Sequence, residues 1–167
     1  NKEMLSDPTT PEEEWDHERY ITIEDEYPVE VMEFDTYQET PELIKVVKNE
    51  VGTVRYHSAL LKSNCRVTSQ PDWGDVYITL EGEYAPDPVS LLEYLVSFRD
   101  ECHFHEEICE ALYKRLLDIC KPDELVVRCL YARRGGIDIN PERYKPGSKK
   151  HHTLHDVTTP FIKTPKQ

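Results

Sequence analysis

The stretch GTVRYHSALLKSNCRVTSQPDWGDVYITLEGEY, residues 52–84, determines the fold that we expect for this chain. Its first and last parts, GTVRYHSALL and GDVYITLEGEY, are rich in β-branched and aromatic residues, which are favoured in β-strands. The polar segment between them contains a cysteine, Cys65, and a Pro-Asp-Trp-Gly turn that holds Asp72. We therefore predict two neighbouring strands joined by a loop that carries both residues.

The sequence after this stretch predicts two helices and then two more strands. PVSLLEYLVSFRD (88–100) and HFHEEICEALYKRLLDIC (103–120) place apolar residues at helical spacing, and Pro122 ends the second helix. ELVVRCLYAR (124–133) is typical of a strand, and two glycines turn the chain into a fourth strand, IDINPERY (137–144). This order, β-β-α-α-β-β, predicts an α+β fold with two helices on one face of a four-stranded antiparallel sheet.

The negative charge of the chain is concentrated near its beginning. The net charge is −13 over 167 residues; residues 1–50 carry 16 acidic and 4 basic side chains, whereas residues 51–167 carry 17 and 16. We divide the chain into an acidic tail and arm (1–47), a folded domain (48–145) and a basic tail (146–167). No basic patch indicates a nucleic-acid partner, and no apolar run is long enough to span a membrane.

The cysteines favour a reducing compartment and single out one thiol. Five is an odd number and no Cys-x-x-Cys pair occurs, which favours reduced thiols in the cytoplasm over a disulfide scaffold. Cys65 stands among polar residues, seven positions before Asp72. A thiolate with a positioned acid suits addition of sulfur to a carbon–nitrogen multiple bond, because charge builds on the nitrogen. The alternative is a loop thiol without a chemical role.

The segment CHFHEE, residues 102–107, is a second candidate site. His105 and Glu106 stand at the start of the second helix, where a carboxylate can accept two hydrogen bonds from a guanine-like base. A zinc site is a weaker alternative because the second ligand pair of a closed site is missing, so we predict no metal. Its possible ligands are Cys102, His103, His105 and Cys109. The structural interpretation is that acidic residues stabilise the helix N-terminus.

The segment YARRGGIDINP, residues 131–141, is the third candidate site. Arg133 and Arg134 precede a Gly-Gly corner and could clamp phosphate groups. They could equally be solvated charges at the end of a strand.

Taken together, these segments resemble one enzyme family. LLKSNC, QPDWG, YLVSFR, FHEE and RRGGIDINP occur in this order between about residues 48 and 143. The set closely resembles the nitrile reductases of queuosine biosynthesis, the NADPH-dependent 7-cyano-7-deazaguanine reductases, and is most like the C-terminal half of their two-module form. The resemblance implies the tunnelling fold, in which subunits join their sheets into barrels, so we expect an oligomer.

The resemblance also implies a role for each candidate residue. Cys65 corresponds to the nucleophile that adds to the nitrile carbon to give a thioimide, and Asp72 to the acid that protonates the nitrile nitrogen. His105 and Glu106 correspond to the pair that holds the deazaguanine. Two hydrides from NADPH would then reduce the nitrile to the aminomethyl group.

One departure from the family concerns the cofactor. Single-module members carry a Lys-rich motif tied to NADPH binding, but the matching window here, DPVSLLEYLVSFR (87–99), has neither lysine. Ser90 remains from that motif, and Arg133 and Arg134 are the other candidate cofactor contacts. We therefore expect a second chain, or a missing half, to supply the NADPH-binding motif.

Two further functions stay open at this point. The first is an amidine synthase that forms the same thioimide but adds ammonia without NADPH; the nearly balanced charge of residues 51–167 speaks against a tRNA substrate for it. The second is a non-catalytic subunit of a two-part reductase.

Overall fold

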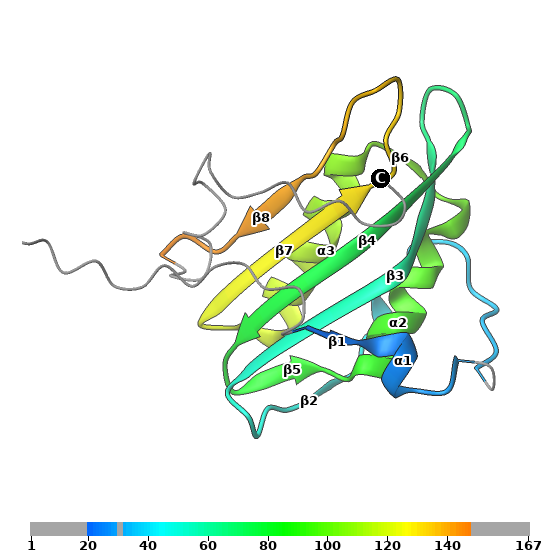
Figure 1. Cartoon of the computed structure of the whole chain (residues 1–167). Coiled ribbons are helices and arrows are strands. Elements are labelled where there is room, and N and C mark those ends of the chain that lie inside the picture. Colours follow the sequence, from blue (N-terminus) through cyan, green and yellow to red (C-terminus); the bar gives the residue numbers. More distant parts are fainter. Residues whose placement is uncertain (1–19, 30–31, 148–167) are drawn as a thin grey trace, which may run out of the picture.

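Residues 20–29 and 32–147 are described by the computed structural model, and the statements below concern these residues (Figure 1). Most of the two predicted tails, residues 1–19 and 148–167, therefore falls outside the described part of the chain. The described part has a mixed α+β fold with one large sheet and few helices, as the sequence predicts.

The four predicted strands form the centre of the large sheet. They are β3 (Thr53–Cys65), β4 (Pro71–Glu81), β7 (Glu124–Tyr131) and β8 (Glu142–Tyr144). They lie side by side in this order, and each neighbouring pair is antiparallel. Alternate residues of β4, namely Val76, Ile78 and Leu80, are fully buried, because successive side chains of a strand point to opposite faces.

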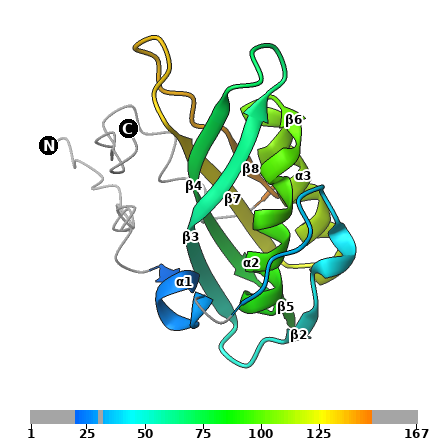
Figure 2. The same ribbon diagram turned by 90° about the vertical axis from the view of Figure 1, so that its right-hand side faces the viewer.

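Two helices cover one face of this sheet (Figure 2). Helix α2 (Pro88–Val96) begins with Asp87 as its N-cap and Pro88 in its first turn. Helix α3 (His105–Cys120) ends at Lys121, whose backbone is left-handed, just before Pro122. Their apolar faces form the core with the sheet, including Leu92, Leu95, Leu112 and Leu116. No helix in the described ranges has the length and apolar character needed to cross a membrane.

Several short elements surround these layers, and the sequence patterns did not predict them. They are β1 (Ile21–Thr22), α1 (Ile23–Glu26), the 3-10 helices η3 (Pro41–Leu43) and η4 (Ser97–Asp100), β2 (Val46–Lys48), β5 (Tyr84–Pro86) and β6 (Cys102–His103). Strands β2 and β5 form a small separate sheet. Strands β1 and β6 both pair in parallel with β3, so the large sheet has six strands rather than four.

The loop that was predicted to carry Cys65 and Asp72 is much shorter than expected, which corrects that prediction. Cys65 is the last residue of β3, and Asp72 is the second residue of β4. The polar residues Ser63 and Asn64 belong to the ladder and pair with Asp72 and Pro71. Cross-strand pairing outweighs the low strand propensity of these polar residues. Both candidate residues therefore stand on a rigid sheet end.

The fourth strand is also shorter than the predicted range 137–144. Gly135 and Gly136 both have positive φ, 56° and 81°, and a bridge between Arg134 and Ile137 closes the turn. The chain reaches β7 again only at Glu142. The two glycines therefore form a protruding turn, and only the last three residues of the predicted strand pair with the sheet.

Candidate active site

Cys65 lies at the tip of the β3–β4 hairpin and is partly exposed. Its backbone N–H donates to the carbonyl of Gln70 at 2.8 Å, and its carbonyl accepts from the N–H of Ser69 at 2.8 Å. Hydrogen bonds from the Thr68 hydroxyl, from the backbone N–H groups of Thr68 and Val67 and from Arg134 lower the pKa of Cys65 to about 7. The hairpin turn thus stabilises a thiolate that solvent can reach.

Asp72 is buried on β4, directly opposite Ser63 of β3. Residues that face each other across an antiparallel pair point to the same side of the sheet, and so does the residue two positions along. Cys65 is the diagonal neighbour of Asp72, for which a separation of roughly 7–8 Å is usual. The side chains of Cys65 and Asp72 therefore lie on the same face of the hairpin.

Arg134 connects the two residues. Its Nε lies 3.2 Å from Asp72 Oδ1, and its guanidinium also donates to Cys65 and, at 2.8 Å, to Gln70 Oε1. Arg134 comes from the turn after β7, which lies at the same end of the sheet as the β3–β4 hairpin tip, because the end of β7 pairs with the start of β4. Its contacts differ from the phosphate clamp considered for it on sequence grounds: the guanidinium is engaged by the carboxylate of Asp72.

His105, the first residue of α3, completes the surroundings of Asp72. Its Nε2 lies 3.2 Å from Asp72 Oδ2, and its ring stacks on Tyr131 with centroids 3.9 Å apart and an interplanar angle of 6°. Both carboxylate oxygens of Asp72 therefore have a cationic or imidazole neighbour. The structure places the predicted residues Cys65, Asp72 and His105 around one point.

Two buried polar atoms beside Asp72 have no hydrogen-bond partner within the described residues. They are the hydroxyl of Ser63 and Nδ1 of His105. Buried polar groups in folded proteins are almost always paired, so two orphaned groups in one place indicate a position for a polar ligand. The sequence analysis missed Ser63, although its position two residues before Cys65 puts it on the same face of the strand.

Glu106 is separated from this group, because adjacent residues of a helix point in different directions. It is exposed on α3 and borders an open hollow of about 430 Å³ that also contacts Glu110 and Arg143. Burial raises the pKa of Tyr131, and the nearby charges of Asp72 and Glu106 raise it further. Tyr131, whose ring stacks on His105, thus has Asp72 and Glu106 as electrostatic neighbours. Sequence reasoning also missed this residue.

The residues proposed as cofactor contacts all make hydrogen bonds within the chain. Ser90 is buried in α2, where its hydroxyl donates to the carbonyl of Asp87 at 2.8 Å and accepts from the N–H of Lys45 at 2.9 Å. Arg133 is exposed but makes two hydrogen bonds to Asp138, at 2.9 and 3.0 Å. With Arg134 on Asp72, no group of free cations remains among these three to hold phosphates.

The four possible zinc ligands have different surroundings. Cys102 is exposed, Cys109 is buried, and His103 and His105 contact carboxylates. Among residues 20–29 and 32–147, no three His, Cys, Asp or Glu side chains gather in a way that could hold a metal ion.

A solvent-accessible thiolate next to a buried carboxylate, an imidazole and a guanidinium is typical of enzymes that form covalent adducts through sulfur. Residues 71–150 match the family model described as QueF-like protein. The chain is 40% identical over 142 residues to an NADPH-dependent 7-cyano-7-deazaguanine reductase of Colwellia psychrerythraea. It is 41% identical over 112 residues to one of Hydrogenovibrio crunogenus. The chain is thus related to the 7-cyano-7-deazaguanine reductases and carries a QueF-like domain, as the resemblance predicted.

The lengths of these relatives differ from that of the chain. The two matches cover 83% and 67% of this chain but only 46% and 40% of the relatives, so the chain spans less than half of their length. A solved structure, the archaeosine synthase QueF-Like in the apo form, superposes with a TM-score of 0.55 at 16% identity. The match covers 59% of this chain and 98% of that one, and it supports the fold alone.

Proposed function

We propose that this chain is the covalent-catalysis half of a 7-cyano-7-deazaguanine reductase. The observation that carries the proposal is the Cys65 thiol, whose pKa is lowered to about 7, with Asp72 as its diagonal neighbour and Arg134 in contact with both. The names of the two relatives supply the substrate and the cofactor, a 7-cyano-7-deazaguanine and NADPH.

The chemistry of this half is addition of a thiol across a nitrile. The Cys65 sulfur forms a bond to the nitrile carbon, and one π bond of the C≡N group opens toward nitrogen. The proton released by the thiol passes to Asp72, which gives it to the nitrogen, so that the product is a neutral thioimide. Arg134 holds the thiolate and Asp72 together while the sulfur–carbon bond forms.

The heterocycle is held by groups on the helix side of the sheet. His105 Nδ1 and the Ser63 hydroxyl are buried and unpaired within the described chain, so a polar base edge can satisfy both. Glu106 accepts from the N–H edge of the deazaguanine, in agreement with the family pattern. Because Glu106 borders the open hollow rather than contacting Asp72, we propose that the base bridges these two places or that Glu106 serves a neighbouring subunit's site.

NADPH binding belongs to another part of the enzyme in this proposal. Ser90, Arg133 and Arg134 are all engaged by other residues, and the lysines of the family motif are absent. We propose that a second chain or half supplies the cofactor site, within an assembly of tunnelling-fold units whose sheets join. All five cysteines are free thiols, in keeping with a cytoplasmic enzyme.

Mass spectrometry tests the covalent step directly. Incubation of the chain with 7-cyano-7-deazaguanine should add one substrate mass to the peptide that contains Cys65. Cys65→Ala should abolish the adduct, whereas Cys102→Ser, which removes the other exposed thiol, should leave it intact. Absence of any adduct on the wild-type chain, or an adduct on Cys102 alone, would refute the proposal.

The cofactor assignment has its own test. Titration of the purified chain with NADPH should give no binding at micromolar concentrations, and oxidation of NADPH should begin only when a companion that carries the Lys-rich motif is added. Tight binding of NADPH by the chain alone would contradict the assignment to a second half.

A further inference from the structure

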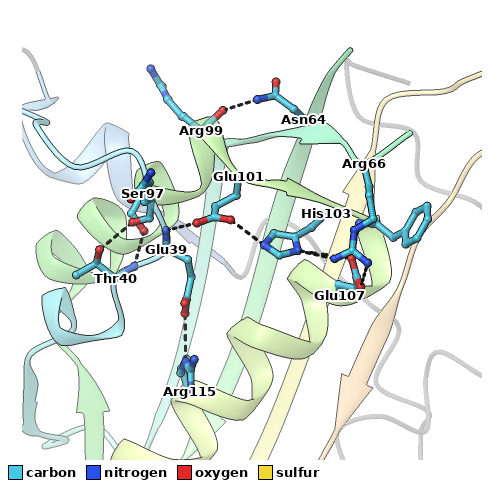
Figure 3. A network of polar contacts seen from close by, with 12 residues as sticks. Glu39, Thr40, Asn64, Arg66, Ser97, Arg99, Glu101, His103, Glu107 and Arg115 are labelled. Atoms are coloured by element: carbon cyan, nitrogen blue, oxygen red, sulfur yellow. Dashed lines mark hydrogen bonds and ion pairs between the residues drawn. The ribbon is translucent and has the colours of Figure 1, made fainter. Parts of the chain in front are cut away.

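A cluster of four charged or titratable side chains lies next to the thiol and is used by no step above. We call Arg66, Glu101, His103 and Glu107 the His103 cluster (Figure 3). Its centre is the imidazole of His103, whose Nε2 lies 2.9 Å from Glu101 Oε2 and whose Nδ1 lies 3.5 Å from Glu107 Oε2. Arg66 NH1 contacts Glu107 Oε1 at 2.9 Å, and Arg66 NH2 lies 3.4 Å from His103 Nδ1.

The cluster joins β3, which carries Cys65, to α3, which carries His105, by way of β6. Arg66 follows Cys65 directly at the end of β3, and His103 of β6 pairs with Cys65 in the parallel ladder. Glu107 belongs to the first turn of α3, in which His105 contacts Asp72. The side chains of the cluster therefore fix the thiol-bearing strand end against the helix turn that holds the acid.

Three contacts of backbone N–H groups strengthen this connection. Glu107 Oε2 accepts the N–H of Phe104 at 2.8 Å and so caps the start of α3. The N–H of Asn64 donates to the carbonyl of Glu101 at 2.8 Å, one residue before Cys65. Glu101 also accepts the N–H of Glu39 through Oε1 at 2.9 Å, so the N-terminal arm is tied to the same cluster. Figure 3 shows a path of contacts from Glu39 through Glu101 and His103 to Arg66 and Glu107.

We infer that His103 is a positioning residue for Cys65. This inference rests on the proposed function. The side chains of the cluster are between about one quarter and one half exposed, so single ion pairs among them add little to the stability of the fold. Their effect is geometric, because a covalent addition requires the sulfur and the acid in one fixed arrangement. His103 serves this role because its two ring nitrogens reach Glu101 and Glu107 at once.

Variants of His103 separate positioning from a merely structural role. His103→Ala removes both contacts, and His103→Gln keeps one side-chain donor and one acceptor. Asp118→Ala is the matched control, since it breaks another exposed ion pair of α3, Lys114 to Asp118 at 2.8 Å. All three should lower the melting temperature by no more than about 4 °C.

The first measurement is the rate of adduct formation at Cys65 with saturating 7-cyano-7-deazaguanine. We expect a fall of about ten- to a hundredfold in His103→Ala, partial recovery in His103→Gln and no change in Asp118→Ala. The concentration for half-saturation should stay within about threefold, because the cluster does not hold the base. An unchanged rate in His103→Ala would overturn the inference.

The second measurement needs no substrate and so keeps the inference separate from the proposed function. Hydrogen exchange of the backbone N–H of Asn64 should be faster in His103→Ala than in the wild type, and unaffected in Asp118→Ala. If the wild-type chain forms no nitrile adduct yet this difference is found, the proposed function fails while the positioning contact stands. Equal exchange in His103→Ala and the wild type refutes the positioning contact itself.

Discussion

Replacement of Arg134 by glutamine tests whether its guanidinium holds the Cys65 thiolate. The variant removes one of the hydrogen-bond donors that lower the pKa of Cys65 and leaves those of Thr68 and Val67 in place. The thiolate is the charged form, so loss of a cationic donor disfavours it and raises the pKa from about 7 toward the usual value of 9.0. The reactive form then appears only at higher pH.

The size of the effect depends on two opposing terms. With a pKa of about 7, about half of the thiol is ionised at neutral pH; a rise of about one unit leaves about one tenth. A thiolate of higher pKa is intrinsically more nucleophilic, by about threefold per unit for a Brønsted slope of about 0.4–0.5. The rate at neutral pH therefore falls only about twofold, whereas the plateau at high pH rises about threefold. The decisive quantity is therefore the pH at which the rate reaches half of its maximum.

The assay is alkylation of Cys65 by iodoacetamide, followed by peptide mass spectrometry from roughly pH 5 to pH 10. The wild type should reach half of its maximal rate near pH 7, and Arg134→Gln about one unit higher. Arg133→Gln is the matched control, because it removes the same charge from the next residue, which is bound to Asp138. Identical midpoints in the wild type and Arg134→Gln, or an equal shift in Arg133→Gln, would refute the reasoning.

Four further outcomes are expected. Asp72→Asn should slow formation of the nitrile adduct at Cys65 by about a hundredfold or more while iodoacetamide still reacts, as followed by mass spectrometry. Ser63→Ala removes a buried hydroxyl that has no partner within the described residues, so the free energy of unfolding in urea should not fall, whereas half-saturation by the nitrile should require about tenfold more substrate. Burial raises the pKa of Glu142 to about 7, so between the unfolded value of 4.5 and pH 7 the folded state binds the extra proton. Stability should therefore fall as the pH rises through that window, and urea titrations of Glu142→Gln should lack this component. Leu116→Ala, in the core face of α3, should lose about 2–5 kcal/mol of unfolding free energy in the same measurement.

The elements that could be predicted from the sequence are those with a clear period and a clear end. Helix α3 repeats apolar residues along one face and stops before Pro122, and β4 is rich in β-branched and aromatic residues and ends before Gly82. Strands β1 and β6 contain two residues each, which is too short for any period to be read. They form because the edge of β3 offers backbone hydrogen-bond partners. β3 is far from both strands in the sequence, so a local pattern cannot reveal the pairing.

The candidate site was likewise predictable only in part from the sequence. The motif resemblance singled out Cys65, Asp72 and His105, and the structure brings Asp72 and His105 together. It could not show that Arg134 would bind Asp72 rather than a phosphate, because that contact depends on the pairing of β4 with β7, which are far apart in the sequence. Ser63 escaped notice because its polarity suggested a loop, whereas the ladder turns it toward Asp72.

The two parallel strands on the outer edge of β3 have a consequence for association. An uncovered edge strand can recruit the edge of another chain, and here β1 covers Tyr56 and His57 while β6 covers Asn64 and Cys65. Another chain that paired with the hairpin end of β3 would have to displace β6. His103 would then move away from Cys65 together with β6. If His103 positions Cys65 as inferred, pairing of another chain at that end of β3 should impair the thiol, whereas pairing beside β8 should leave it in place.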